Sequence, residues 1–234
     1  MAERFMRTEA IFGKENMDKL QNAHVLVFGI GGVGGYAVEA LVRSGIGTIG
    51  IVDNDRVAKS NLNRQIIADE TTIDMYKTDV AEERIKKINP RCNVHKYNVF
   101  YMPDCKNIPF ENYDYVVDAI DTVTAKIDII QKCKALNIPV ISSMGTGNKT
   151  DPTKLQVTDI QKTSFCPLAR VMRHELKKRS IKNVKVVYST EEPISKTVEG
   201  ERQERHTPGS FMPVPATAGL IIAAEVIKDI IHKT

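Results

Sequence analysis

Residues 23–35 read AHVLVFGIGGVGG, an apolar run that passes into a stretch with five glycines among eight residues. The run is rich in β-branched residues and ends at a glycine, which predicts a buried parallel strand. Residues 35–45, GYAVEALVRSG, follow with apolar side chains at helical spacing and a glycine where the helix should end. A glycine loop between a strand and a helix lets a phosphate approach the backbone, and the first N–H groups of the helix can bind it. The glycines of this predicted nucleotide site are Gly29, Gly31, Gly32 and Gly34.

Apolar runs and helical patterns continue to alternate as far as residue 145. Further strands are expected at residues 46–55, 93–100, 113–121 and 138–145. Helices are expected at residues 76–90 and 124–137. Repeated strand–helix–strand units pack as a doubly wound, largely parallel sheet with helices on both faces. The chain is therefore expected to adopt a Rossmann-like α/β fold.

The pattern changes in the last third of the chain. Strands at 154–160 and 184–190 flank a basic helix at 167–180, and an apolar helix at 211–233 closes the chain. The polar segment 191–210 predicts a long mobile loop. No repeat or linker separates the two halves, so we expect a single domain. Its expected parts are an N-terminal helical arm (1–20), a nucleotide-binding core (21–150) and a C-terminal strand and helix elaboration (151–234).

Composition limits the classes of protein that the chain can be. Its 42% hydrophobic content is ordinary for a globular protein, and its net charge of +4 is compatible with a polyanionic partner. The four cysteines lie far apart and form no CxxC pair, so we expect no structural zinc and reduced thiols in the cytoplasm. The N-terminus has no apolar signal segment, and the apolar C-terminal helix carries Glu225, Lys228 and Asp229. We therefore expect no attachment to a membrane.

Polar residues after the second predicted strand indicate which nucleotide binds. Asp53 ends that strand, where a carboxylate can accept hydrogen bonds from ribose hydroxyls. The glycine loop and this acid do not distinguish NAD from ATP as the bound nucleotide. Arg64 and Lys77 favour ATP, because cleavage between the α- and β-phosphates shifts negative charge onto the pyrophosphate. The side chains expected around these phosphates are Asp55, Asn61, Arg64, Gln65 and Lys77.

Asp121 follows the fourth predicted strand, at the edge where ligands bind in open parallel sheets. Beside a triphosphate, its carboxylate is suited to hold Mg²⁺. The alternative is an N-cap for the helix that begins near Thr122, since aspartate is favoured at that position. Asp118 is expected to be a supporting or capping group.

These motifs together resemble those of the ubiquitin-activating-enzyme superfamily, in its bacterial branch with the molybdopterin- and thiamine-pathway adenylyltransferases. The matching pieces are GIGGVGG (29–35), VDNDRVAKSNLNRQ (52–65), Lys77 and DAIDT (118–122). The resemblance implies that the protein binds ATP and Mg²⁺ and adenylates a carboxylate, with release of pyrophosphate. By the same resemblance, the residues that bind ATP and Mg²⁺ are Asp53, Asn61, Arg64, Gln65, Lys77 and Asp121.

The N-terminal segment RFMRTEAIFG (4–13) resembles the R-Y-x-R-Q segment of the same superfamily. In that segment the second arginine reaches the nucleotide of the partner subunit. Arg7 occupies this position, although Thr8 stands where the family has glutamine. The resemblance therefore implies a homodimer, with catalytic contributions from Arg7, Arg64, Lys77 and Asp121.

The second half of the chain resembles one family within this superfamily, the tRNA threonylcarbamoyladenosine dehydratases. Segments 154–179 and 209–231 carry the resemblance, together with the lack of zinc-binding CxxC pairs. It implies ATP-dependent activation of the threonyl carboxylate at tRNA position 37, followed by ring closure onto the carbamoyl group. The implied substrate is tRNA carrying threonylcarbamoyladenosine, and a cysteine desulfurase or sulfur acceptor is a candidate partner.

Cys166 departs from the pattern of that family, which usually has aspartate before the sequence PLA. A cysteine in this half can form a thioester in the activators of ubiquitin-like proteins. The other interpretation is a small, partly buried thiol in a surface turn. It is favoured because no neighbouring cysteine or histidine in the sequence would activate the thiol.

The basic helix predicted at 167–180 is a candidate surface for tRNA. At helical spacing its cations can present one face to phosphates, whereas the alternative is a solvated helix face. The candidate tRNA contacts are Arg170, Arg173, Lys177, Lys178 and Arg179.

Two other functions remain open at this level. One is an adenylyltransferase that activates the C-terminal Gly-Gly of a ubiquitin-like sulfur carrier, against which the missing CxxC pairs argue. The other is an NAD-dependent oxidoreductase or a nucleotide-binding module without adenylation activity. Arg64, Lys77 and Asp121 argue against that class, because hydride transfer needs no cations on the phosphates.

Overall fold

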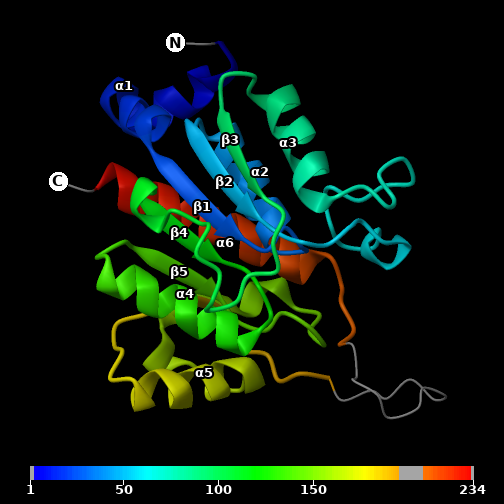
Figure 1. The fold of residues 1–234 in the computed structure, drawn as a ribbon, viewed down its shortest axis with the longest axis vertical. Coiled ribbons are helices and arrows are strands. Elements are labelled where there is room, and N and C mark those ends of the chain that lie inside the picture. Colours follow the sequence, from blue (N-terminus) through cyan, green and yellow to red (C-terminus); the bar gives the residue numbers. More distant parts are fainter. Residues whose placement is uncertain (1–2, 195–207, 233–234) are drawn as a thin grey trace.

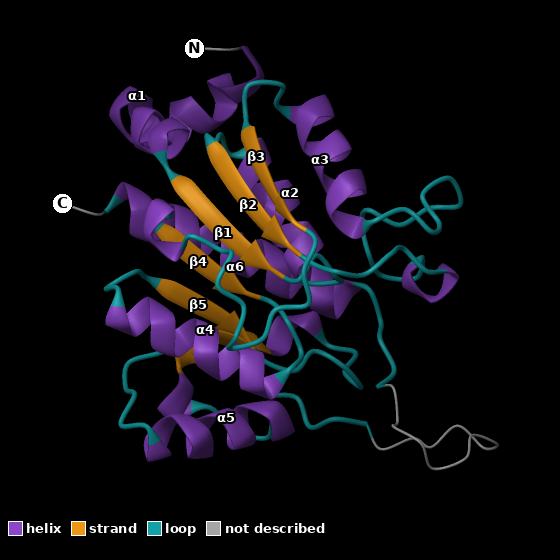
Figure 2. Cartoon of the chain, viewed as in Figure 1, coloured by secondary structure: helices purple, strands orange, loops and turns teal. Residues whose placement is uncertain are grey.

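The computed structural model describes residues 3–194 and 208–232, which form a seven-stranded sheet flanked by helices (Figures 1 and 2). The strands lie in the order β3-β2-β1-β4-β5-β7-β6, and every neighbouring pair is parallel except β6 with β7. The largely parallel, doubly wound sheet expected from the sequence is therefore confirmed. The strands are β1 (His24–Phe28), β2 (Thr48–Val52), β3 (Asn93–Tyr97), β4 (Tyr115–Asp118), β5 (Val140–Ser143), β6 (Leu155–Asp159) and β7 (Lys185–Ser189).

Helices cover both faces of this sheet. They are α1 (Met6–Asn22), α2 (Gly34–Arg43), α3 (Lys77–Ile88), α4 (Val123–Ala135), α5 (Pro167–Lys178) and α6 (Pro213–Ile231). Side chains of α1, α2, α3 and α6 share one hydrophobic cluster, and those of α4 and α5 share the other. Among the described helices, none is both long enough and apolar enough to cross a bilayer.

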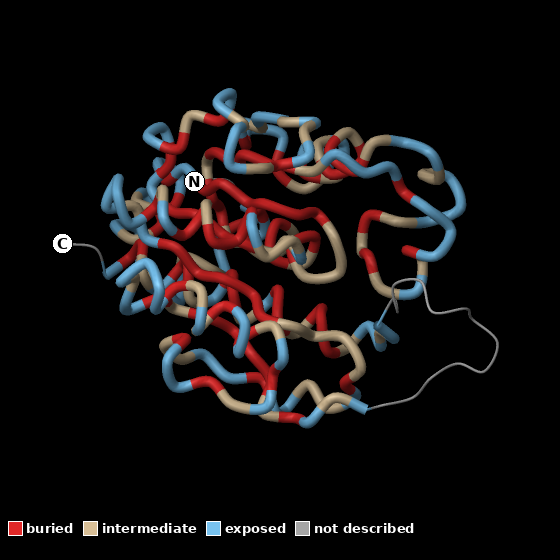
Figure 3. The backbone as a smooth tube through the Cα atoms, turned by 60° about the horizontal axis from the view of Figure 1, so that its bottom comes forward, coloured by how far each residue is buried: buried red, intermediate tan, exposed pale blue. Residues whose placement is uncertain are grey.

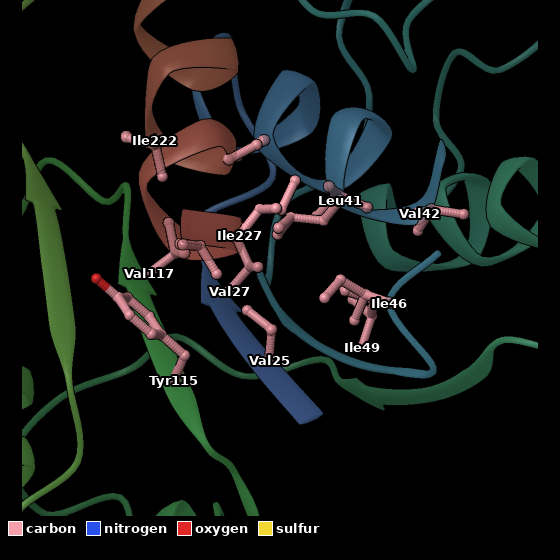
Figure 4. Close-up of a cluster of buried hydrophobic side chains, with 14 of the residues drawn as sticks. Val25, Val27, Leu41, Val42, Ile46, Ile49, Tyr115, Val117, Ile222 and Ile227 are labelled. Atoms are coloured by element: carbon pink, nitrogen blue, oxygen red, sulfur yellow. The ribbon is translucent and has the colours of Figure 1, made fainter. Parts of the chain in front are cut away.

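The two clusters lie on opposite faces because successive side chains of a strand point to opposite sides. In β1, Val25 and Val27 belong to the cluster under α2 and α6 (Figure 4), whereas Leu26 and Phe28 belong to the cluster under α4. All four are completely buried. The apolar run that leads into the glycine loop is thus an interior strand of the sheet, paired with β2 on one side and β4 on the other. Figure 3 shows buried backbone in the interior of the molecule and exposed segments around it.

The C-terminal helix α6 is part of the core, as its apolar sequence predicts. It crosses α2 so closely that a Cβ atom on Gly219 would lie 2.3 Å from the carbonyl oxygen of Val33. Backbone contact of this kind admits only glycine. Because Val33 belongs to the glycine loop, α6 packs directly against the backbone of that loop.

The predicted mobile loop 191–210 has two hydrogen-bonded ends, which the sequence did not indicate. The Glu191 carboxylate accepts from the backbone N–H of Asp151 at 2.9 Å. Asn148 binds both ends, accepting from the N–H of Ile194 through its carbonyl (2.7 Å) and from the N–H of Gly209 through its side chain (2.6 Å). The middle of the predicted loop, 195–207, lies outside the described residues.

Candidate functional site

A cleft of about 540 Å³ opens at the carboxyl ends of β1, β2 and β4. This is the point where the strand order reverses, which is the expected ligand site of an open parallel sheet. The volume is typical of a small-molecule site. The predicted residues that line it are Gly29, Gly31, Gly32, Asp53, Asp55, Asn61, Arg64, Gln65, Lys77 and Asp121. Of the nucleotide-binding and catalytic residues predicted from the sequence, Gly34 and Arg7 do not line it.

The glycines of the loop have different roles. Gly29 has a φ of 83°, and a Cβ atom there would lie 2.8 Å from the carbonyl oxygen of Ala119. A Cβ atom on Gly34 would lie 1.8 Å from the carbonyl oxygen of Gly29. On Gly31 the nearest atom would be 3.9 Å away, at Nε2 of Gln65. Gly29 and Gly34 therefore let the loop pack, whereas Gly31 borders open space in the cleft.

Asp53 connects the end of β2 to the glycine loop. Its carboxylate accepts hydrogen bonds from the N–H groups of Ile30 (2.7 Å) and Asp55 (2.8 Å). Burial raises the pKa of this carboxyl above its usual value, and the nearby Lys77 ammonium opposes that shift. A carboxylate has about four acceptor positions, so Asp53 can still accept from a ribose hydroxyl.

The segment 59–65 forms one wall of the cleft. The Arg64 guanidinium donates to the carbonyl of Ser60 and to the Asn63 side chain, both at 2.8 Å. Its remaining N–H groups leave donors for phosphate oxygens. Gln65 is buried, and its Oε1 atom has no hydrogen-bond partner among the described residues. A buried carbonyl oxygen without a donor is costly, so this amide is a polar group available to a ligand.

Lys77 is the first residue of α3, and its side chain is only 6% exposed. Its ammonium lies 2.6 Å from the carboxylate of Asp55, which is 59% exposed. A buried charge needs such a partner. Asp55 therefore acts through Lys77 in this structure, by holding the cation at the edge of the cleft.

Asp121 lies in the turn between β4 and α4, at the surface of the cleft. Its carboxylate makes no hydrogen bond or ion pair with any residue that the structure describes. The N-cap interpretation is wrong, because α4 begins at Val123 and its N-cap residue is Thr122. No group of three or more metal-ligating side chains gathers among residues 3–194 and 208–232. One free carboxylate beside a triphosphate fits Mg²⁺, which often takes one or two carboxylates with phosphates and waters.

An aromatic wall of the cleft was not predicted. It consists of Phe100 and Tyr101, which follow β3 together with the aliphatic Val99. Phe100 is 61% exposed, whereas Tyr101 is buried with its ring centroid 4.7 Å from that of Phe28. The sequence placed residues up to 100 in the third strand, but β3 ends at Tyr97 and the chain turns across the cleft. The apolar run of residues 99–101 beyond the strand end concealed this turn.

A buried ion pair beneath the cleft was also not predicted. Asp118 and Lys126 are completely buried, and their charged atoms lie 2.9 Å apart. Ser142 donates to the same Asp118 oxygen at 2.6 Å. A lysine in a helix is almost always solvated, and nothing local in the sequence marks Lys126 as an exception.

The basic residues of α5 do not form one uniform face. Arg173 donates to the carbonyl of Thr163 at 2.9 Å. Glu175 accepts from the two cations at the end of the helix, each at 2.8 Å. Arg170 and Lys177 are exposed and make no ion pair with the described residues. These two are the cations of α5 that remain available to a phosphate.

The cysteines are mostly inaccessible. Cys166 is 2% exposed, so the expectation of a partly buried thiol in a surface turn understates its burial. Burial raises the pKa of the Cys92 thiol to about 11 and that of the Cys133 thiol to about 12. Of the four cysteines, Cys105 is half-buried and the other three are buried.

Iodoacetamide at pH 8 is expected to alkylate Cys105 well before the other three cysteines, because the reaction needs an accessible thiolate. Peptide mass spectrometry of the native protein over time measures the order. Alkylation of Cys166 as fast as Cys105 would mean that solvent reaches its thiol. A thioester-forming role for Cys166 would then again be a candidate.

Comparison with known proteins identifies the family of this chain. The ThiF family matches residues 3–234. A tRNA threonylcarbamoyladenosine dehydratase of Bacillus subtilis is 42% identical to this chain over an alignment 243 residues long. The alignment covers 99% of this chain and 96% of the relative. Crystal structures of the Escherichia coli tRNA N6-threonylcarbamoyladenosine dehydratase are 37% identical and cover 99% of this chain and 95% of theirs. The AMP complex has a TM-score of 0.91 and the ATP complex one of 0.88. With this match over nearly its whole length, the chain belongs to the ThiF family.

Proposed function

We propose that this protein is an ATP-dependent tRNA threonylcarbamoyladenosine dehydratase. It activates the threonyl carboxylate of the modified adenosine at tRNA position 37 and closes it into a ring. The observation that carries the proposal is one cleft in which Arg64, Lys77 and Asp121 converge on a glycine loop. The similarity over 99% of the chain to a dehydratase of that name supports the choice of substrate.

The residues of the cleft suit adenylation of a carboxylate. Asp53 accepts from the ribose, and the glycine loop with the first N–H groups of α2 binds phosphates. The substrate carboxylate attacks the α-phosphorus and pyrophosphate leaves, giving a mixed anhydride. Arg64 and Lys77 stabilise the negative charge that builds on the leaving pyrophosphate. The carbamoyl group then attacks the activated carbonyl carbon and AMP leaves, so no protein nucleophile is required.

Asp121 is the residue that would hold Mg²⁺ in this proposal, since its carboxylate is free and faces the cleft. When bound, the ion would neutralise charge on the phosphate oxygens. Asp121 itself would fix the position of the nucleotide relative to the carboxylate that attacks it.

Arg7 fits the proposal only in a homodimer. It is exposed and does not line the cleft of its own chain. Its helix, α1, lies at the end of the sheet where β1 begins (Figure 1). In the proposed dimer, Arg7 of one protomer reaches the nucleotide of the other. The substrate tRNA also implies a cytoplasmic enzyme.

A nucleoside assay tests the function directly. The protein is incubated with ATP, Mg²⁺ and tRNA carrying threonylcarbamoyladenosine, and the digested nucleosides are analysed by mass spectrometry. Loss of one water from the modified base, dependent on ATP, is the expected result. An unchanged base, with pyrophosphate exchange stimulated by a carrier protein ending in Gly-Gly, would instead support the sulfur-carrier adenylyltransferase.

The tRNA surface can be tested on α5. The double change Arg170→Ala/Lys177→Ala is expected to weaken tRNA binding about tenfold at moderate salt, because it removes two unpaired charges. The matched change Lys178→Ala/Arg179→Ala removes cations already paired with Glu175 and is expected to have a smaller effect. Filter binding at several salt concentrations measures both. Equal effects of the two pairs would remove α5 as a specific contact.

A further inference from the structure

The ion pair of Asp118 and Lys126 connects three elements beneath the nucleotide cleft. Asp118 ends β4, Lys126 lies in α4, and Ser142 lies in β5. All three side chains are completely buried. One oxygen of the Asp118 carboxylate accepts from both Lys126 (2.9 Å) and Ser142 (2.6 Å).

This network makes hydrogen bonds to the backbone of the turn that carries Asp121. The Lys126 ammonium also donates to the carbonyl oxygen of Ile120 at 3.1 Å. The other oxygen of Asp118 accepts from the N–H of Ile120 at 3.4 Å. Both polar backbone groups of Ile120 are therefore held by the ion pair, one residue before Asp121.

The same turn packs on the glycine loop. The N–H of Ala119 donates to the carbonyl of Phe28 at 2.9 Å, and its own carbonyl oxygen occupies the space where Gly29 would carry a Cβ atom. Ala119, Ile120 and Asp121 all line the cleft. A shift of the turn would thus move Asp121 relative to the phosphates that the glycine loop binds.

Stability alone does not account for this pair. Apolar residues of similar volume often stabilise a protein as well as a buried ion pair does, because removing charges from water is costly. A fully bonded buried network does, however, rigidify the groups that it contacts. Here those groups are the backbone of one turn in the cleft.

We propose that Asp118, Lys126 and Ser142 are positioning residues for adenylation, which hold the turn 119–121 so that the Asp121 carboxylate faces the nucleotide. The effect on rate rests on the proposed function, whereas the effect on the order of the turn does not.

The decisive variant replaces the pair without leaving a buried charge. Asp118→Leu/Lys126→Met is expected to fold, because neither partner remains uncompensated. Its kcat is expected to fall about 10²-fold, as for other small displacements of catalytic groups. The KM for ATP is expected to change less than about threefold, since Asp53, Lys77 and the glycine loop remain.

Two matched controls separate positioning from general loss of stability. Ser142→Ala is expected to lower kcat about fivefold to tenfold, whereas Ser143→Ala is expected to leave it unchanged. Ser143 is the buried neighbour on the same strand, and among the described residues its hydroxyl bonds only to the carbonyl of Met144. Lys185→Met removes the ion pair with Asp229, outside the cleft, and is expected to lower the melting temperature without lowering kcat.

Amide hydrogen exchange provides a measurement that needs no reaction. In the double variant, the peptide containing residues 119–122 is expected to exchange about tenfold faster, while peptides of β2 and α2 are unchanged. A folded double variant with normal kcat, or with normal exchange in this peptide, would overturn the proposal. If the wild-type protein modifies no tRNA, the proposed function fails, and the exchange of the turn alone decides whether the pair positions it.

Discussion

Asp121→Ala is expected to lower kcat for ATP-dependent dehydration by about 10²–10³-fold, and Arg64→Ala by a similar factor. Asp121 presents a carboxylate to the cleft that no described residue binds, so its removal takes away a contact available to the nucleotide and its ion. Arg64 presents guanidinium donors to the same cleft. Rates with saturating ATP and tRNA, measured as nucleoside product, give the comparison.

Neither change should unfold the protein. Asp121 is exposed, and Arg64 makes two hydrogen bonds within its own segment, so each variant is expected to melt within a few degrees of the wild type. Asp104→Ala and Lys59→Ala are matched controls, since both side chains are exposed and neither lines the cleft. Normal turnover in Asp121→Ala or Arg64→Ala would place the reaction elsewhere.

Magnesium dependence separates the two residues. If Asp121 holds the ion, Asp121→Ala is expected to need a higher Mg²⁺ concentration for half-maximal rate, whereas Arg64→Ala is not. A titration of Mg²⁺ at fixed ATP measures the shift. An unchanged titration in Asp121→Ala would assign the ion to the phosphates alone.

The parallel core was predictable because its determinants are local. Buried strands such as β1 are apolar on both faces, and the glycines that follow it mark the turn into α2. Parallel strands also bring their carboxyl ends together, so Asp53 and Asp121 had to lie at one edge although they are distant in sequence. Topology therefore predicts the cleft from a few strand ends.

The residues that the sequence missed depend on tertiary neighbours. Lys126 has the local sequence of an ordinary helical lysine, and only the position of Asp118 on the adjacent strand explains its burial. Phe100 belongs to the apolar run 99–101 that follows β3, but no strand neighbour is paired beyond Tyr97. Cys166 is buried at the N-cap position of α5, where its Sγ atom packs against Gly145. Each outcome is decided by packing partners that sequence periodicity does not encode.

Gly34→Ala is expected to abolish nucleotide binding and to destabilise the fold by roughly 3 kcal/mol. Its Cβ atom would lie 1.8 Å from the carbonyl oxygen of Gly29 and 3.3 Å from Cβ of Ala119. The first is a backbone atom between β1 and α2, so the clash can be relieved only by moving the strand–turn–helix unit itself. The melting temperature from thermal unfolding and the ATP affinity from calorimetry are both expected to fall in this variant.

Gly31→Ala provides the contrast within the same loop. The nearest atom to its Cβ would be Nε2 of Gln65 at 3.9 Å, so the fold is expected to retain its melting temperature. ATP binding is nevertheless expected to weaken about tenfold or more, because the methyl group would occupy the space through which a phosphate approaches the backbone. Normal ATP affinity in a stable Gly31→Ala protein would mean that phosphate does not lie over Gly31. Loss of affinity without loss of stability would identify that open space as the phosphate site. The spacing of the glycines in the sequence does not distinguish a glycine needed for packing from one that borders the phosphate.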